Sequence, residues 1–272
     1  MNTASHPAMQ AVATPVARPG LAARLFARVL PWASLPLLVL AWTIAASRVP
    51  SYVLPQPWEV LGEGLRWLKD GSLLSNLGHS LLREFMGFGL AAVLALLLGV
   101  GLGLSARLRS FMSPLNSLFM AIPPIAWTPL MMIFLGLGNA SIVAVIVLAA
   151  MFPMALTIQD GVQSIQGGLV RAARTLGAGR AQLLRHVYLP ACLPCVTAAL
   201  RIGFSQAWRA LVAAEMIGAS QGIGWMVSTG GQIGNSSQVL LGICLIGLIA
   251  WLTERLVFRR LEAHYTHWLG QS

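Results

Sequence analysis

Six apolar segments, each about long enough to cross a lipid bilayer, constrain this chain more than any other feature. A helix needs roughly 20 apolar residues to cross a hydrocarbon core of about 30 Å, and only helices and closed barrels satisfy every backbone polar group there. Only 10% of the 272 residues are charged, whereas a soluble domain carries about 25%. We therefore predict an all-α, polytopic membrane protein with six transmembrane helices. The predicted helices are residues 31–47, 85–105, 113–135, 140–159, about 190–214 and about 238–257.

The third segment contains two consecutive prolines, Pro123 and Pro124, in the stretch "AIPPIAW". Proline lacks a backbone N–H and ends or kinks a helix. Non-helical backbone at membrane depth is tolerated only where protein or a water-filled cavity satisfies its polar groups. We therefore expect the third segment, from Pro123 to Trp127, to line a path through the protein.

Arginine gathers in the segments between the apolar runs, and six spans place these basic segments on one side of the membrane. The positive-inside rule assigns that side to the cytoplasm. We predict a bacterial inner-membrane protein with cytoplasmic tails at 1–30 and 263–272 around a transmembrane domain at 31–262. A transit peptide and a cleaved signal peptide are the alternatives for the N-terminal tail. The net charge of +10 then reflects membrane insertion and contact with lipid, and it does not indicate nucleic-acid binding.

The longest basic segment is the loop at about 160–189, which holds "RAARTLGAGRAQLLRHVYLP". Gly177 and Gly179 weaken a helix and indicate a turn between two short helices, and Pro190 is suited to start the fifth span. Such a loop either lies on the membrane or docks into a groove on a partner protein. Small alanines favour docking, because they allow close approach and bury little area in lipid. Four residues at helical spacing predict one apolar face: Ala172, Leu176, Leu183 and Val187.

This stretch resembles a motif of a known family. The inner-membrane permeases of ATP-driven (ABC) importers carry a cytoplasmic EAA loop of the form E-A-A-x₃-G-x₉-I-x-L-P. Val187 replaces the usual Ile, and Arg171 stands where the family has Glu. Other stretches over about 75–262, among them "IPPIAWTPLMMIFLGLGNAS", resemble the nitrate/sulfonate/taurine/bicarbonate branch of these permeases. The residues that match the loop motif, with its spacing intact, are Ala172, Ala173, Gly177, Val187, Leu189 and Pro190.

The resemblance implies a type I ABC importer permease fold, in which the loop is a coupling helix seated on a cytoplasmic ABC ATPase dimer. It also implies a second copy of the permease and an external substrate-binding protein. The chain would form half of a gated pathway for a small anion such as taurine, an alkanesulfonate or nitrate, without being an enzyme. ATP-Mg would bind the partner ATPase, and this chain would carry no cofactor. The sequence gives an independent argument. A P-loop needs G-x-x-x-x-G-K-[ST], and the only lysine of this chain, Lys69, stands in "RWLKDG", which does not match that motif. The chain is therefore not expected to be a P-loop ATPase itself.

Three ionisable residues lie in or at the end of the fifth segment: Arg201, Arg209 and Glu215. Ionisable groups inside a membrane are costly and usually face the interior of the helix bundle or a cavity. One interpretation is a positive lining for an anion path, and the other is a pair of arginines bonded to carbonyl groups or to a neighbouring helix. With Pro123, Pro124 and Trp127, these three residues are the candidates for the pathway.

Two other classes of function stay open. The stretch "GASQG" fits G-x-S-x-G with Ser220 as a nucleophile, a motif that needs a strand–turn–helix elbow and a histidine within reach. An intramembrane serine hydrolase would therefore need His79 to reach Ser220. A membrane scaffold that transports nothing is the second alternative.

Three further patterns have structural interpretations. Cys192 and Cys195 form a C-x-x-C without a second ligand pair, which favours two packing thiols over a zinc or redox site. His264 and His267 lack a third ligand, so we expect no metal site. The glycine-rich run at 99–103 predicts a close contact between two helices.

Overall fold

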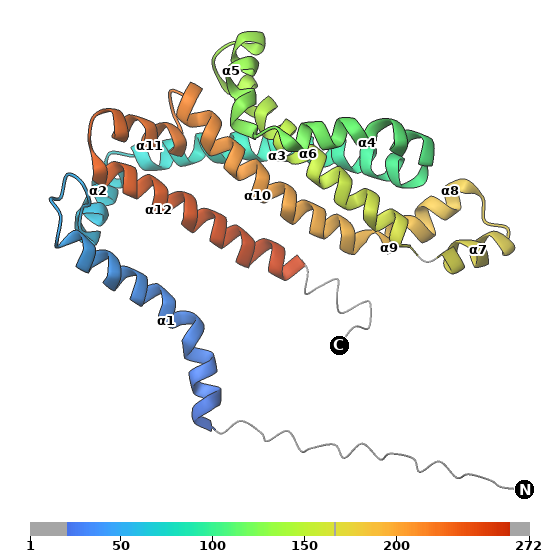
Figure 1. The fold of residues 1–272 in the computed structure, drawn as a ribbon, viewed down its shortest axis with the longest axis horizontal. Coiled ribbons are helices and arrows are strands. Elements are labelled where there is room, and N and C mark those ends of the chain that lie inside the picture. The colour runs from blue at the N-terminus through green and yellow to red at the C-terminus, as the bar shows by residue number, and fades with distance from the viewer. Residues whose placement is uncertain (1–20, 166, 262–272) are drawn as a thin grey trace, which may run out of the picture. The chain divides into compact units, whose positions relative to one another are not determined.

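The computed structural model describes residues 21–165 and 167–261, and all regular elements of these residues are helices (Figure 1). The predicted all-α class is thereby confirmed. The chain divides into two compact units, Met1–Val49 and Pro50–Ser272. The first contains α1 (Leu21–Ala46). Of the predicted tails, residues 1–20 and 263–272 lie outside the described residues.

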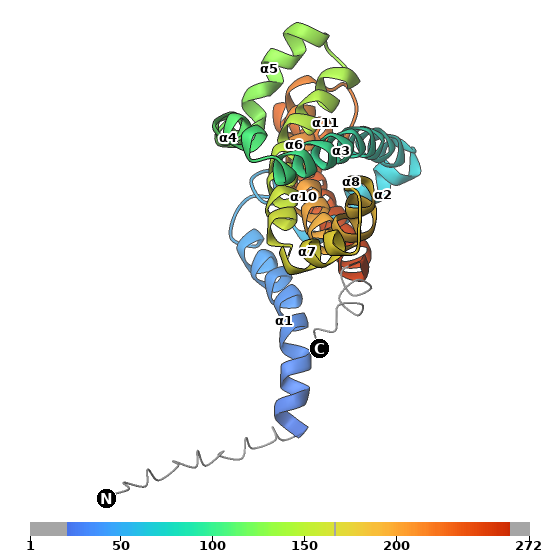
Figure 2. The same ribbon diagram turned by 90° about the vertical axis from the view of Figure 1, so that its right-hand side faces the viewer.

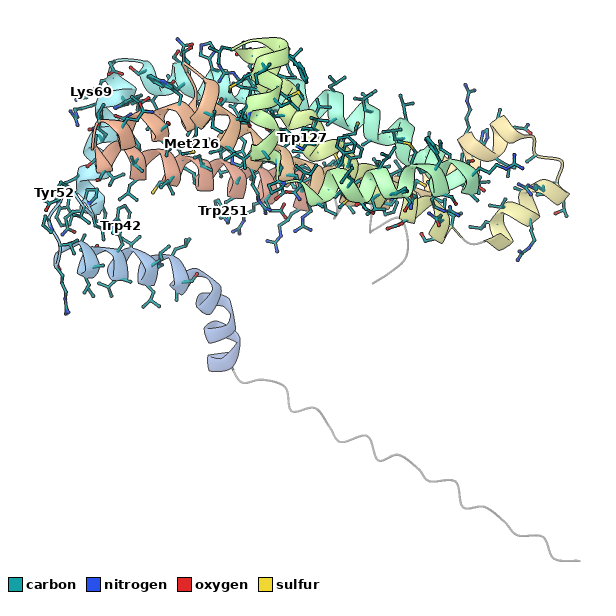
Figure 3. All side chains as sticks on the ribbon, turned by 45° about the horizontal axis from the view of Figure 1, so that its top comes forward. Trp42, Tyr52, Lys69, Trp127, Met216 and Trp251 are labelled. Carbon is teal, nitrogen blue, oxygen red and sulfur yellow. The ribbon has the colours of Figure 1, made fainter. Side chains whose placement is uncertain are left out.

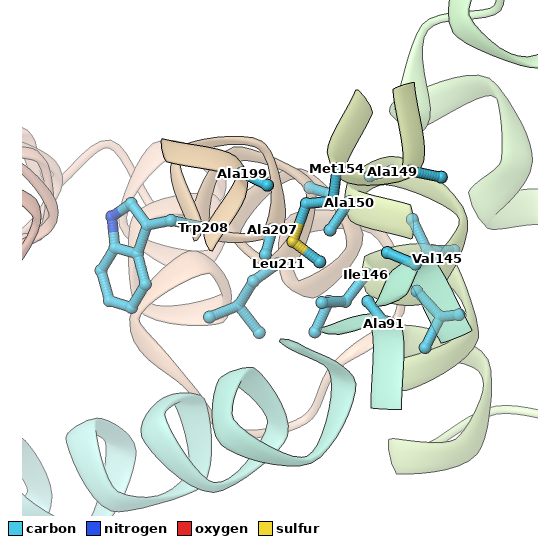
Figure 4. Close-up of a cluster of buried hydrophobic side chains, with 14 of the residues drawn as sticks. Ala91, Val145, Ile146, Ala149, Ala150, Met154, Ala199, Ala207, Trp208 and Leu211 are labelled. Carbon is cyan, nitrogen blue, oxygen red and sulfur yellow. The ribbon is translucent and has the colours of Figure 1, made fainter. Parts of the chain in front are cut away.

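Three long helices form the centre of the second unit. Their buried faces are rich in alanine and β-branched residues, which pack as one apolar cluster (Figure 4). Small side chains let the helix backbones approach closely, as is common between helices in membranes. The three helices are α3 (Ser72–Leu104), α6 (Asn139–Ser164) and α10 (Leu193–Gly218).

Glycines set the distance between α3 and α6. A Cβ atom at Gly99 would lie 2.7 Å from the carbonyl oxygen of Ala155, and one at Gly103 would lie 2.5 Å from Cβ of Val162. Neither position has room for a side chain unless the helices move apart. The close contact predicted for the glycine run at 99–103 is therefore confirmed.

The predicted proline break is also present. α4 (Ala106–Ala121) ends just before the two prolines, and α5 (Pro124–Leu135) starts at the second of them. The two helices are bent by 97°, so α5 turns away from the direction of α4 (Figures 1 and 2). Its residues Trp127 and Met131 pack against the central apolar cluster. Pro123 takes an extended conformation as the N-cap of α5.

The connection from α6 to α10 consists of short helices, α7 (Gly167–Thr175) and α8 (Arg180–Leu183), a π-helical turn η1 (Leu184–Tyr188) and α9 (Leu189–Ala191). Pro190 stands in the first turn of α9 and does not start the fifth span, contrary to the sequence-based expectation. A second proline, Pro194, stands in the first turn of α10. Because proline suits the first turn of a helix, two closely spaced prolines favour two separate helix starts.

The remaining helices lie before α3 and after α10. They are α2 (Pro57–Lys69), α11 (Ile223–Gln232), α12 (Ser236–Thr253) and the π-helical turn η2 (Glu254–Phe258) that continues α12. Asn235 caps α12 by accepting a hydrogen bond from the N–H of Gln238. In the linker between α2 and α3, Asp70 accepts hydrogen bonds from Ser72, which lower the pKa of its carboxyl group.

Each of the six predicted apolar segments coincides with a helix or a bent pair of helices. Within the described residues, three helices are long and apolar enough to cross a membrane, and two bent pairs pass the same criterion together. The apolar part of α1, Ala33–Ala46, is shorter. The three helices are Ser72–Leu104, Asn139–Ser164 and Ser236–Leu261, and the pairs are Ala106–Ala121 with Pro124–Leu135 and Ala181–Ala191 with Leu193–Gly218.

A buried ion pair joins α3 to α10. Arg83 Nη1 lies 2.8 Å from Oε1 of Glu215, and both side chains are almost completely buried. The hydroxyl of Ser80 donates to the same carboxylate at 2.8 and 2.9 Å, and the N–H of Gly224 donates to it at 2.9 Å. Four hydrogen-bonding contacts thus satisfy a carboxylate that would otherwise be too costly to bury.

The same cluster fixes the segment between α10 and α11. Arg83 also donates to the carbonyl oxygen of Gln221 at 2.6 Å, and Asn76 accepts the N–H of Gly222 at 2.7 Å. Gly222 has a φ of +129°, and a Cβ there would lie 2.5 Å from the Glu215 carboxylate. Glycine is therefore required at this position for space as well as for backbone conformation. We call Asn76, Ser80, Arg83 and Glu215 the polar clamp.

Removing one charge of the polar clamp should destabilise the protein strongly. Glu215→Gln leaves the Arg83 guanidinium buried without its counter-ion, and we expect a loss of about 3–5 kcal/mol in the free energy of unfolding. The thermal unfolding midpoint in detergent measures this loss. Glu254→Gln removes the carboxylate of a partly exposed ion pair and serves as the control, with an expected cost below about 1 kcal/mol. Equal losses in the two variants would contradict a stabilising role of the clamp.

Candidate functional site

One face of α10 lines a groove of about 590 Å³. Four of its polar members, Thr197, Arg201, Ser205 and Arg209, recur every four residues along the helix, so they form a stripe on one side. η2 closes the groove with Glu254 and Phe258. The α10 residues of the groove are Pro194, Thr197, Ala198, Arg201, Ile202, Ser205, Gln206 and Arg209.

Arg201 and Glu254 form an ion pair across the groove. Arg201 Nη2 lies 2.5 Å from Oε1 of Glu254, and both side chains are partly exposed, at 47% and 38%. The pair connects α10 with η2. Of the two interpretations of Arg201, this contact agrees with an arginine bonded to a neighbouring helix, although the residue still lies on the groove wall.

Arg209 lies at the other end of the stripe. It is eight residues beyond Arg201, which corresponds to about 12 Å along a helix, and its side chain is exposed. Among the described residues, Arg209 forms no ion pair. Ser205 and Gln206, both half-buried, lie between the two arginines and add neutral hydrogen-bonding groups.

A second, smaller cavity of about 80 Å³ connects the proline break with the same stripe. Pro124 and Trp127 line it from α5, and Gln206 lines it from α10. Figure 3 labels Trp127 on α5. Phe119 stacks on Trp127, with ring centroids 5.5 Å apart. Because Gln206 borders both cavities, the structure brings Pro124 and Trp127 close to the candidate arginines of the fifth segment.

Glu215 does not border either cavity. It is 1% exposed and belongs to the polar clamp. The segment that the clamp holds contains Ser220, whose side chain is exposed. Ser220 lies in the short segment between two helices, α10 and α11. The serine nucleophile of a G-x-S-x-G hydrolase instead lies in a turn between a strand and a helix. This geometry argues against the hydrolase alternative.

A glycine turn shapes the basic connection between α6 and α10. Gly177 has a φ of +84°, its N–H donates to the carbonyl of Arg174, and the N–H of Ala178 donates to the carbonyl of Ala173. These two bonds define a Schellman motif, in which a left-handed residue ends a helix. A Cβ at Gly177 would meet nothing within 4 Å, so glycine is favoured here by backbone conformation and not by space.

The next helix starts immediately after this turn. The N–H of Gly179 donates to Oε1 of Gln182 at 2.9 Å, and its carbonyl accepts the N–H of Leu183. Two short helices joined by a turn are therefore confirmed, but the predicted single apolar face is wrong. Leu176 stands in the turn and is 89% exposed, whereas Leu183 is buried at 5%.

The residues of the loop motif are mostly accessible. Ala172, Gly177, Leu189 and Pro190 are exposed, and Ala173 and Val187 are half-buried. Arg171, at the position where the motif has Glu, is exposed on α7 beside Arg174. The ionisable side chains of the stretch 167–190 are all arginine, histidine or tyrosine, so this surface carries no negative charge.

The two cysteines near the start of α10 pack inside the protein. Cys192 is buried, and the thiol of Cys195 donates to the carbonyl of Cys192 at 2.9 Å. A Cβ at Gly161 of α6 would collide with the side chain of Cys195. These contacts support the interpretation of Cys192 and Cys195 as packing thiols.

Comparison with known proteins agrees with this architecture. The family described as binding-protein-dependent transport system inner membrane component matches residues 87–264. The taurine transport system permease protein TauC of Escherichia coli (strain K12) is 38% identical over 241 residues, which cover 86% of this chain and 87% of that protein. The nitrate import permease protein NrtB of Synechococcus elongatus is 30% identical over 238 residues, with coverage of 82% and 85%.

The fold is similar to a solved ABC transporter structure. A chain of the MetNI methionine ABC transporter in an inward-facing conformation aligns with a TM-score of 0.60 at 24% identity, over 74% of this chain and 98% of that chain. The fold predicted from the EAA-like stretch is therefore confirmed. The family match spans more than half of the chain, and the protein belongs to the family of inner membrane components of binding-protein-dependent transport systems.

Proposed function

We propose that this chain is the permease subunit of an ATP-driven importer and that the connection between α6 and α10 couples it to a cytoplasmic ATPase. The observation that carries the proposal is the Schellman turn at Gly177. It holds α7 at the surface, with Ala172 exposed for a close contact. Closure of the ATPase dimer would move this connection and, through α9, the start of α10.

The proposal includes several partners that this chain does not contain. ATP-Mg binds to the partner ATPase dimer, because a P-loop lysine needs a glycine-rich loop and the only lysine here, Lys69, ends helix α2 (Figure 3). A second copy of this chain completes the pathway, and an external substrate-binding protein delivers the substrate. The protein lies in a bacterial inner membrane with both termini in the cytoplasm, as the arginine distribution favours.

The α10 groove is the proposed translocation pathway. Arg201 and Arg209 lie on its wall, and Pro124 and Trp127 of the proline break line the smaller cavity that shares Gln206 with it. Pro123 is included in the proposed pathway as the N-cap of α5. A polar stripe on a membrane-spanning helix is costly unless it faces water or protein. The substrate is a small anion, taurine or an alkanesulfonate before nitrate, because TauC is the taurine permease among the relatives and the groove is positively charged.

The coupling role is tested at Gly177 by co-purification with the ATPase encoded beside this gene. Gly177→Val places a β-branched residue at a φ of +84°, which such residues strongly disfavour. We expect the amount of ATPase that co-purifies with the variant in detergent to be at least tenfold lower than with the wild type, and uptake by cells to be lost. Gly177→Asn is the matched control, because asparagine is also found at this position of a Schellman motif.

The valine and asparagine side chains are similar in size. Comparing the two variants therefore separates the effect of backbone conformation at residue 177 from steric obstruction of the ATPase by a side chain. Retention of the ATPase by the Asn variant and its loss from the Val variant is the expected result. Equal retention by both variants would refute the coupling role of this turn. If the wild-type chain retains no ATPase in mild detergent, the importer assignment itself fails.

A further inference from the structure

The α10 groove contains three charged side chains, two arginines and one glutamate. Glu254 comes from η2, a different helical segment from the one that carries Arg201 and Arg209. Its carboxylate lies 2.5 Å from the guanidinium of Arg201, so these two charges largely cancel for any ion that is farther away. The groove wall therefore presents a net charge of +1.

The two arginines of the groove are consequently not equivalent. Arg201 has a carboxylate at its guanidinium, whereas the described residues provide no counter-ion for Arg209. An anion that binds beside Arg209 also finds the neutral side chains of Ser205 and Gln206 within the same groove. The single negative charge of such an anion is then balanced by the guanidinium of Arg209. A second negative group would have only Arg201 left as a cation, about 12 Å along the helix from Arg209, and Glu254 already neutralises that charge.

We propose that Glu254 determines charge specificity in this permease, because it neutralises Arg201 and thereby restricts the groove to monovalent anions bound at Arg209. This inference rests on the proposed function of the groove as the pathway. It assigns selectivity to the permease chain itself, in addition to any selection by a partner.

The position of Glu254 fits this role. It is the first residue of a π-helical turn at the end of α12, and π-turns inside α-helices occur frequently at functional sites. The adjacent Arg255 stacks over Trp251, with 5.3 Å between its guanidinium carbon and the ring centroid. Arg255 is not among the residues that line the groove, so it does not change the charge of the wall.

The test compares two probes that differ in charge on the same carbon skeleton, ethanesulfonate and 1,2-ethanedisulfonate. The full-length chain is co-purified with its ATPase, reconstituted in lipid nanodiscs without the binding protein, and titrated with each probe by calorimetry. We expect the wild type to bind ethanesulfonate more tightly. Glu254→Gln removes the carboxylate beside Arg201 and raises the net charge of the groove from +1 to +2. The ratio of the two affinities should then shift by about tenfold toward the disulfonate, as expected for one added charge at a distance of about 12 Å.

A double variant distinguishes charge from shape. Arg201→Gln combined with Glu254→Gln returns the groove to a net charge of +1, and it should restore the preference of the wild type for the monovalent probe. Arg209→Gln should weaken binding of both probes at least tenfold. An unchanged ratio in Glu254→Gln, a double variant that behaves like Glu254→Gln, or absence of binding to the wild type would each overturn the proposal.

Failure of this inference and failure of the proposed function are separable. Retention of the ATPase during co-purification reports on the importer assignment and does not depend on Glu254, which lies outside the α6–α10 connection. A complex that retains the ATPase but shows no charge preference would refute the role of Glu254 alone.

Discussion

The ion pair between Arg83 and Glu215 is the interaction on which the architecture of the second unit most depends. It joins the first and the last of the three central helices, and its remaining hydrogen bonds fix the segment that leads into α11. Buried charges are tolerated only when they are paired and hydrogen-bonded, so helix packing and loop conformation here satisfy the same requirement. A shift of α3 against α10 would leave both charges without partners.

The second interhelical ion pair, Arg201 with Glu254, contrasts with the first in its surroundings. Both of its side chains keep more than a third of their surface exposed, and exposed pairs contribute little to stability. A partly exposed pair can therefore be rearranged at a low free-energy cost, and its main effect is on the charge of the groove. One pair holds the helices together, and the other tunes what the groove attracts.

Local patterns in the sequence predicted much of this structure, and long-range pairings could not be predicted. The turn at Gly177, the break at Pro123 and Pro124, and the close contact of the glycine run at 99–103 each follow from residue types within a few positions. The partner of Glu215 is 132 residues away in the chain, and no periodicity connects the two. Asn76, Ser80 and Arg83 are four and three residues apart, so they lie on one face of a helix. This pattern could have indicated a helix that starts before residue 85, as α3 does at Ser72.

The central claim is that the polar stripe of α10 faces a water-filled pathway. Cysteine accessibility in native membranes tests it most directly, in a background that lacks Cys192, Cys195 and Cys244. Ser205→Cys, on the groove wall, should react with a membrane-impermeant, charged thiol reagent. Leu97→Cys, at an exposed apolar position of α3, should not react. Equal protection of the two cysteines from the reagent in a folded protein would contradict the assignment of the groove as the pathway.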